Sequence, residues 1–248
     1  MRRFRPALLM TALTAVVCVA FVRLGQWQWD KGVHRQQLWD AFARGADAAL
    51  PAPADLDAPL RFQRVTVTGH YDAAHQFLLD NRIHAGVAGY EVLTPFQLSD
   101  GRVLLVDRGW VPFSGYRAKL PDVGFAAGDL ALAGTAITGR LDQLPTPGLA
   151  QGRAAPSADG SWPKVTSYPD MDQLRTALGP AAGAATAARP PGRILLLDAG
   201  APDGYVRDWQ PPGLPPLRHF SYAIQWWGFT VTAVVLWVIM GLRRGRHP

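Results

Sequence analysis

The two ends of this chain are long apolar segments, and they constrain its fold more than any other feature. The first runs from about residue 6 to residue 27, and the second from residue 220 to residue 242. About 20 apolar residues in a helix cross the hydrocarbon core of a bilayer, because each residue rises by about 1.5 Å. We therefore predict two transmembrane helices around a central domain of residues 28–219.

The first segment could instead be a cleaved secretory signal peptide, because basic residues precede it. Its apolar run is longer than the roughly 7–15 residues of a typical signal core. No small-residue cleavage motif follows it, since the next residues are Trp27, Gln28 and Trp29. We therefore expect the segment to be retained in the membrane.

The positive charge of the chain is concentrated at its ends. The net charge is +6, yet residues 30–218 contain 18 Lys and Arg against 19 Asp and Glu. A nucleic-acid-binding protein carries its basic patch on the folded domain, so we expect no nucleic-acid partner. Short arginine-rich ends stay in the cytoplasm. We predict a two-pass protein of the cell (inner or plasma) membrane, with cytoplasmic termini and a periplasmic or otherwise extracytoplasmic central domain.

Tryptophans lie at the end of each apolar segment that faces the central domain. Trp27 and Trp29 follow the first segment, and Trp226 and Trp227 lie near the start of the second. Tryptophan is enriched where membrane helices meet the headgroup region. Both pairs are therefore expected at the same surface of the bilayer.

The central domain has the pattern of a mainly β (α+β) fold. Alternating or short apolar runs predict about six strands at residues 64–69, 76–80, 90–98, 102–107, 130–141 and 193–198. Asp100-Gly101 between two of these runs predicts a hairpin. Strands with short connections favour an antiparallel sheet or a small barrel.

Helices and loops occupy the rest of the central domain. Residues 30–45 are expected to continue or follow the first membrane helix, and Asp170 or Pro169 should start a short helix that Gly179 ends. Residues 144–163 and 180–192 are rich in Pro, Gly and Ala and are expected to be loops. Residues 210–217 contain four prolines and should be extended.

The residues of the central domain form no known catalytic pattern. The sequence lacks a G-x-S-x-G motif, a phosphate-binding loop and an H-E-x-x-H motif, so we expect no enzyme. The simplest expectation for Asp80 and Asp107 is pairing with Arg82 and Arg108. Cys18 is the only cysteine, which excludes an internal disulfide and a metal site built from cysteines.

One histidine stands at the expected membrane surface. His219 directly precedes the second apolar segment, follows Arg218 and lies near Trp226. A neutral imidazole can be an axial ligand of haem iron, and an arginine can pair with a haem propionate. The alternative is a structural hydrogen bond from His219 to headgroups or backbone.

Two further groups are candidate contacts for a partner. Tyr222 and Gln225 are three residues apart on one helix face, and polar groups at this depth need partners from the first helix or from another protein. The 108–110 segment, Arg-Gly-Trp, ends a strand. It is either a turn with Trp110 packed on the core or a partner surface.

Several segments resemble, in order along the chain, the surfeit locus protein 1 family. Residues 24–28 are Leu-Gly-Gln-Trp-Gln, which resembles the family's L-G-x-W-Q signature. The other matching blocks are Val65, Val67, Gly69 and Tyr71; Gly86, Gly89, Tyr90 and Thr94-Pro95; residues 106–112, which end in Arg-Gly-Trp-Val-Pro; and residues 219–228. Asp107 is a departure, because many members have Asn there.

The resemblance implies an assembly factor for haem-copper terminal oxidases, chiefly cytochrome c oxidase. It implies a chaperone that assists insertion of haem a into the largest subunit, with haem a bound only transiently. The expected partners are the lipid bilayer, cytochrome c oxidase subunit I and, as a further candidate, haem a synthase. His219, Arg218 and Trp226 would contact the cofactor. The expected partner-binding residues are Tyr222, Gln225, Arg108, Trp110 and Trp27.

Two alternatives to a haem chaperone remain. A scaffold that binds oxidase subunits without touching haem would use Tyr222, Gln225 and the turn at Trp110. A membrane-anchored enzyme of the extracytoplasmic side is the third class, and the missing nucleophile–base arrangement argues against it.

Overall fold

The computed structural model describes residues 4, 6–45, 48–51, 53–57, 61–116, 119–125, 134–146, 152–179 and 192–244. The chain divides into two compact units. One consists of Met1–Asp40 with Pro211–Pro248, and the other is Ala41–Gln210. The first unit is helical and the second is mainly β.

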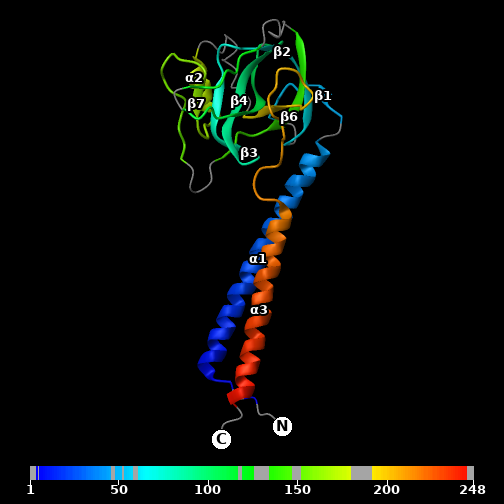
Figure 1. The fold of residues 1–248 in the computed structure, drawn as a ribbon. Helices are drawn as coiled ribbons and strands as arrows, with labels where there is room; N and C mark the ends of the chain where they lie inside the picture. Colours follow the sequence, from blue (N-terminus) through cyan, green and yellow to red (C-terminus); the bar gives the residue numbers. More distant parts are fainter. Residues whose placement is uncertain are drawn as a thin grey trace. The chain divides into compact units, whose positions relative to one another are not determined.

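The helical unit contains the two apolar segments that the sequence predicts. Figure 1 shows α1 (Leu8–Arg44) and α3 (Pro216–Arg244) side by side. Both are long and apolar enough to cross a membrane, and only 6% of the most apolar stretch of each is buried. The core helix of a soluble protein would be mostly buried, so the fold fits a membrane protein with lipid around these helices.

The helix boundaries agree with the predicted ones in one place and differ in another. The first helix continues without a break to Arg44, which is one of the two outcomes expected for residues 30–45. The prediction of an extended segment up to residue 217 is wrong at its end, because Pro216 begins α3. Proline is favoured in the first turn of a helix, where a backbone N–H has no acceptor within the helix.

Two glycines of α1 receive aromatic rings of α3. The indole of Trp227 lies against Gly25 and the ring of Phe220 lies against Gly32, so a β-carbon at either glycine would overlap the ring. Trp29 packs beside both rings, with centroid distances of 5.7 Å to Trp227 and 4.9 Å to Phe220. Small residues here allow the close approach that pairs helices in a membrane.

The strands of the second unit close into a five-stranded barrel (Figure 1). The described strands are β1 (Leu50–Pro51), β2 (Arg64–Tyr71), β3 (Phe77–His84), β4 (Val87–Leu98), β5 (Val103–Pro112), β6 (Thr135–Asp142), β7 (Lys164–Thr166) and β8 (Ile194–Leu197). The order β2-β6-β8-β5-β4 forms a ring because β2 also pairs with β4. β1 flanks β2, and β3 and β7 extend the sheet beyond β4.

Alternating side chains build two apolar layers on this barrel. One set of buried side chains packs together as a core: Val65, Val67, Phe96, Leu104, Val106, Ile137, Leu141 and Leu195. The intervening residues Leu105 and Leu196 belong to a second cluster, which packs against Leu174 and Leu178 of α2 (Met171–Leu178). Successive side chains of a strand point to opposite faces, which explains how one strand serves both layers.

The predicted pattern of strands is largely confirmed. All six predicted strands have a counterpart, although residues 130–133 lie outside the described residues. The hairpin at Asp100-Gly101 is present, with Gly101 at φ 85°. Most pairings are antiparallel, but β1–β2, β5–β8 and β3–β7 are parallel. The short strands β1 and β7 were not predicted.

The predicted short helix is present, and the predicted loops are only partly within the described residues. Asp170 caps α2 through a hydrogen bond from the Gln173 backbone N–H at 2.8 Å, and Gly179 ends the helix. Of the predicted loops, residues 147–151 and 180–191 lie outside the described residues. Ala154 forms an antiparallel bridge with Ser167.

Candidate functional site

His219 lies in the first turns of α3 and is tied to α1. Its Nδ1 atom is 2.9 Å from Oε1 of Gln28. An amide oxygen only accepts, so Nδ1–H is the donor and the neutral ring has its lone pair on Nε2. No hydrogen bond joins Nε2 to any described residue. The ring therefore presents one nitrogen that can bind a metal or accept a hydrogen bond.

Three cations lie on the same segments of the helical unit. Arg35 donates from Nη1 to the carbonyl oxygen of Pro212 at 2.8 Å. Nζ of Lys31 lies 4.7 Å from the centroid of the Trp27 ring, and the Arg218 side chain is exposed. The charges of Arg35 and Lys31 act on the His219 ring. Among the described residues none of these cations has an ion-pair partner, so their charge is available to an anionic group.

The aromatic candidates of the helical unit have different environments. Trp226 is half-buried, and its ring lies 5.5 Å from that of Phe21 on α1, measured between centroids. The Trp27 side chain is 51% exposed. Trp27 and Trp226 therefore give the helical unit one exposed and one half-buried indole.

Tyr222 and Gln225 point away from the paired helix. Tyr222 is 43% exposed and Gln225 is also exposed, whereas Ala223 between them is buried. Neither side chain forms a hydrogen bond with a described residue. The predicted alternative of polar contact with the first helix is therefore absent from the described structure, and contact with another protein stays a prediction.

Arg108 lies inside the β domain. It is only 2% exposed, and its Nε donates to the Asp203 carbonyl oxygen at 2.7 Å. Its Nη1 donates to Gln76 Oε1 at 3.1 Å and to the Val123 carbonyl oxygen at 3.0 Å, while Phe125 covers the guanidinium at 3.8 Å from its ring centroid. A buried charge needs this degree of hydrogen bonding. The structure thus places Arg108 in the domain core rather than on a surface.

The expected pairing of Asp107 with Arg108 is wrong. Oδ1 of Asp107 instead accepts from the backbone N–H of Gly109 at 3.0 Å. The two side chains diverge because neighbouring strand residues face opposite sides of the sheet. Arg82 pairs with Glu91, with Nε and Oε2 3.0 Å apart. Burial and the nearby carboxylate of Glu91 raise the pKa of Asp107 well above its usual range.

Trp110 follows a β-bulge on β5. Gly109 has φ 113°, and the Trp110 backbone N–H donates to the Val206 carbonyl oxygen at 2.8 Å. The indole packs on Gly89, and its ring centroid is 5.3 Å from that of His84. Trp110 thus covers the β3–β4 hairpin. The predicted turn at residues 108–110 is wrong, because β5 continues through Trp110 to Pro112 and stays paired with β4.

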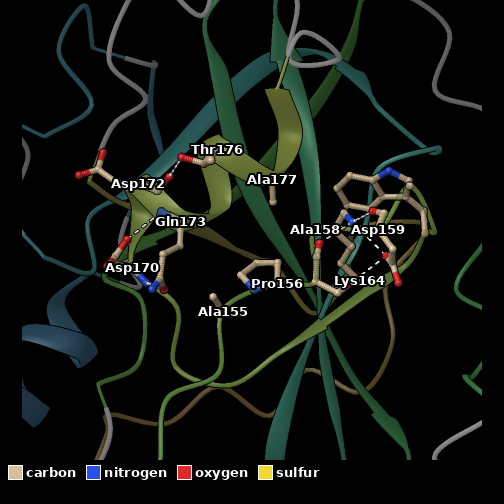
Figure 2. A pocket seen from close by; sticks show the side chains of 13 residues that line it. Ala155, Pro156, Ala158, Asp159, Lys164, Asp170, Asp172, Gln173, Thr176 and Ala177 are labelled. Carbon is tan, nitrogen blue, oxygen red and sulfur yellow. Dashed lines mark hydrogen bonds and ion pairs between the residues drawn. The ribbon is translucent and has the colours of Figure 1, made fainter.

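A groove of the β domain lies beside α2. Figure 2 shows its lining, which encloses about 560 Å³. Lys164 points its Nζ at the carbonyl oxygens of Ser157, at 2.7 Å, and Asp159. The Asp159 carboxylate accepts from the hydroxyls of Ser157 and Ser161. The side chains of Lys164, Ser157 and Asp159 are therefore satisfied within the loop.

The described residues contain no cluster of three or more His, Cys, Asp or Glu side chains that could hold a metal ion. A metal complex would therefore find single ligands rather than a chelating set. Among the residues predicted to contact a cofactor, His219 offers a ring nitrogen without a hydrogen bond.

Comparison with known proteins identifies the family. The SURF1 family model matches residues 15–231, a range that begins inside α1, spans the barrel and ends inside α3. This chain belongs to the SURF1 family. Uncharacterized SURF1-like proteins of Mycobacterium bovis and Mycobacterium tuberculosis are 29% identical over 93% of the chain and 82% of their own length. Surfeit locus protein 1 of Xenopus tropicalis is 26% identical over 94% of the chain and 76% of its own length.

Sequence reasoning proposed His219 as a candidate but did not predict the residues around it. Gln28 is part of the Leu-Gly-Gln-Trp-Gln segment, yet nothing in the sequence pairs it with a residue 191 positions away. Lys31 and Arg35 follow Trp27 at steps of four residues, which places them on one face of a continuing helix. That spacing was the available signal, but it becomes informative only once α1 is known to continue past residue 27.

Proposed function

We propose that this SURF1 family protein holds haem a transiently and assists its insertion into the largest subunit of a haem-copper oxidase. The family is one of oxidase assembly factors. The observation that supports a haem role is the Nε2 atom of His219, which is open for ligation while Nδ1 is bound to Gln28. The Nε2 atom of His219 would supply one nitrogen ligand to a metal complex held here.

The charges around His219 suit the rest of a haem group. A haem carries two propionates, and cations without ion-pair partners can bind carboxylates through charge-assisted hydrogen bonds. Lys31, Arg35 and Arg218 supply such cations on the two helices. Half-buried Trp226 adds an aromatic surface to the same unit. A single nitrogen ligand keeps binding weak enough for transfer, whereas a second strong ligand would retain the cofactor.

Purification of the full chain from cells that make haem a tests this proposal. The wild-type protein should carry haem, measured as haem per protein, and His219→Ala should lose most of it. His75→Ala is the matched control, because His75 pairs with Asp72 in the β domain at 2.7 Å. Equal haem in the wild-type and His219→Ala proteins, or none in the wild type, would contradict the proposal.

A scaffold without haem contact is a second candidate, favoured by the exposed Tyr222 and Gln225 on α3. An amide without a partner at the membrane boundary gains a hydrogen bond when another protein helix packs on it. Tyr222→Ala and Gln225→Leu should then lower recovery of oxidase subunit I in a pull-down. Ile224→Ala is the control, because Ile224 is 63% exposed on the same helix but has no polar group. Unchanged recovery with both polar variants would count against the scaffold.

The proposal also names the partner proteins and the orientation of the chain in the membrane. Haem a synthase is a candidate donor, and subunit I of cytochrome c oxidase is the candidate acceptor. We place the protein in the cell's inner or plasma membrane, with both termini cytoplasmic and the barrel extracytoplasmic. No catalytic step is proposed, and detection of turnover by the purified full-length protein would revive the enzyme alternative.

A further inference from the structure

The contact between His219 and Gln28 determines which ring nitrogen of His219 carries the proton. A neutral imidazole has one N–H, which sits on either Nδ1 or Nε2, and the hydrogen bond made by one nitrogen decides the state of the other. Oε1 of Gln28 lies 2.9 Å from Nδ1 and can only accept. The proton is therefore held on Nδ1.

The acceptor itself is held in place by the packing of the two helices. Gln28 lies three residues after Gly25 and four before Gly32 on α1, so the three share one face. The rings of Trp227 and Phe220 fill the space over these two glycines. Gln28 thus lies between two close contacts of α1 with α3. Its amide faces α3 because it shares the helix face of the two glycines.

The other side of the ring meets no competing acceptor among the described residues. Nε2 of His219 has no hydrogen bond there, and the two charged groups that act on the ring, Lys31 and Arg35, are donors only. These cations cannot draw the proton to Nε2, while they can attract a ligand with anionic groups. The lone pair of Nε2 is left for a metal centre.

We infer that Gln28 is the positioning residue that holds His219 in its Nδ1–H tautomer and presents Nε2 as the single ligand to a metal complex with carboxylate groups. This inference rests on the proposed haem function. Partners that orient a ligating histidine are worth about 10–100-fold in metal affinity. Loss of the Gln28 acceptor should therefore weaken haem binding by about that factor without removing the ligand.

Tautomer measurements test the role of Gln28 without any haem. The full chain is prepared in lipid nanodiscs with ¹⁵N-labelled histidine, and the His219 signals are identified by their loss in His219→Ala. The wild type at alkaline pH should show a protonated Nδ1 and an unprotonated Nε2. Gln28→Glu keeps an accepting oxygen and should keep this tautomer, whereas Gln28→Met keeps the length and should lose it in part. An Nε2–H tautomer in the wild type, or no change in Gln28→Met, would overturn the inference.

A haem titration separates this inference from the proposed function. Iron protoporphyrin is added to the same nanodiscs, and binding is followed by the shift of its Soret band. The expected order of affinity is wild type and Gln28→Glu first, Gln28→Met about 10–100-fold weaker, and His219→Ala weakest. If haem binding depends on His219 but not on Gln28, the inference fails and the haem function stands. If the tautomers are as expected but the wild type binds no haem, the haem function fails while the tautomer assignment stands.

Discussion

At the scale of single residues, β5 places two buried charged side chains next to each other. Asp107 and Arg108 are adjacent on β5 and are 1% and 2% exposed. The guanidinium of Arg108 is satisfied by two carbonyl oxygens and an amide oxygen. Asp107 accepts a hydrogen bond from the Gly109 N–H and lies near the carboxylate of Glu91. The strand thus carries one well-compensated charge and one acid that burial favours in its neutral form.

Asp107→Asn should raise stability at neutral and alkaline pH. The native pKa of Asp107 is raised by burial and by Glu91, so between the ordinary carboxyl pKa and this raised value the native state holds a proton that the unfolded state has released. Wild-type stability therefore falls as the pH rises through that window. Asparagine can still accept from the Gly109 N–H but has no charge, and the expected gain is about 1–3 kcal/mol.

Thermal unfolding of the full chain between pH 4 and pH 9 measures this effect. The advantage of Asp107→Asn should be small at the acidic end and grow with pH. Asp55→Asn is the control, because Asp55 is exposed and also accepts a backbone N–H, at 2.9 Å. An equal advantage at every pH would show that charge is not the cause.

At the scale of elements, the pairing of α1 with α3 depends on aromatic rings that lie on glycines. In a membrane, helix pairing relies on close packing because lipid is as apolar as the side chains. Gly25 and Gly32 provide that closeness for Trp227 and Phe220. The same contacts flank Gln28, so the geometry of the helix pair and that of His219 depend on one another.

Gly32→Leu should separate the helix pair, since its side chain would occupy the place of the Phe220 ring. Overpacking of this kind costs about 1–3 kcal/mol. Unfolding is measured in mixed detergent micelles by tryptophan fluorescence. The midpoint should shift to a lower fraction of denaturing detergent. Gly228→Leu on α3 is the matched control, because no atom lies within 4 Å of its added β-carbon. Equal shifts in the two variants would show that helix propensity or membrane insertion, rather than this contact, sets the stability.

At the scale of the whole molecule, the chain joins two units that place their apolar side chains differently. The apolar stretches of α1 and α3 leave their side chains to lipid, while the barrel buries its apolar residues in its own clusters. The acidic residues all lie between residues 30 and 208, and the ends carry the net positive charge. This distribution favours cytoplasmic termini, because arginine-rich short flanks are retained there.

Cysteine labelling tests this orientation. Cys18 is the only cysteine, so Cys18→Ser provides a background without thiols. In intact cells with a permeable outer layer, a thiol reagent that cannot cross the membrane should label Tyr116→Cys, because Tyr116 is 74% exposed in the β domain. His247→Cys should be labelled only after the membrane is opened. Labelling of both sites in intact cells would contradict the predicted orientation.

The sequence by itself determined the elements whose signals are local. Length and apolarity defined the two terminal helices, alternation defined six strands, and Asp170 and Gly179 defined the ends of α2. It did not define β1 or β7, because strands of two or three residues carry no usable period. The continuation of α1 to Arg44 was left open, because its polar second half has no apolar period to mark it.

Only the tertiary structure decided which residues meet. It closed the barrel through the pairing of β2 with β4, placed Arg108 in the core and left Tyr222 and Gln225 exposed. It also brought Gln28 to His219. These contacts join positions far apart in the chain, and their geometry follows from packing rather than from any local pattern. The sequence thus proposed His219 as a candidate ligand, and the pairing of the two helices decided which of its ring nitrogens is open.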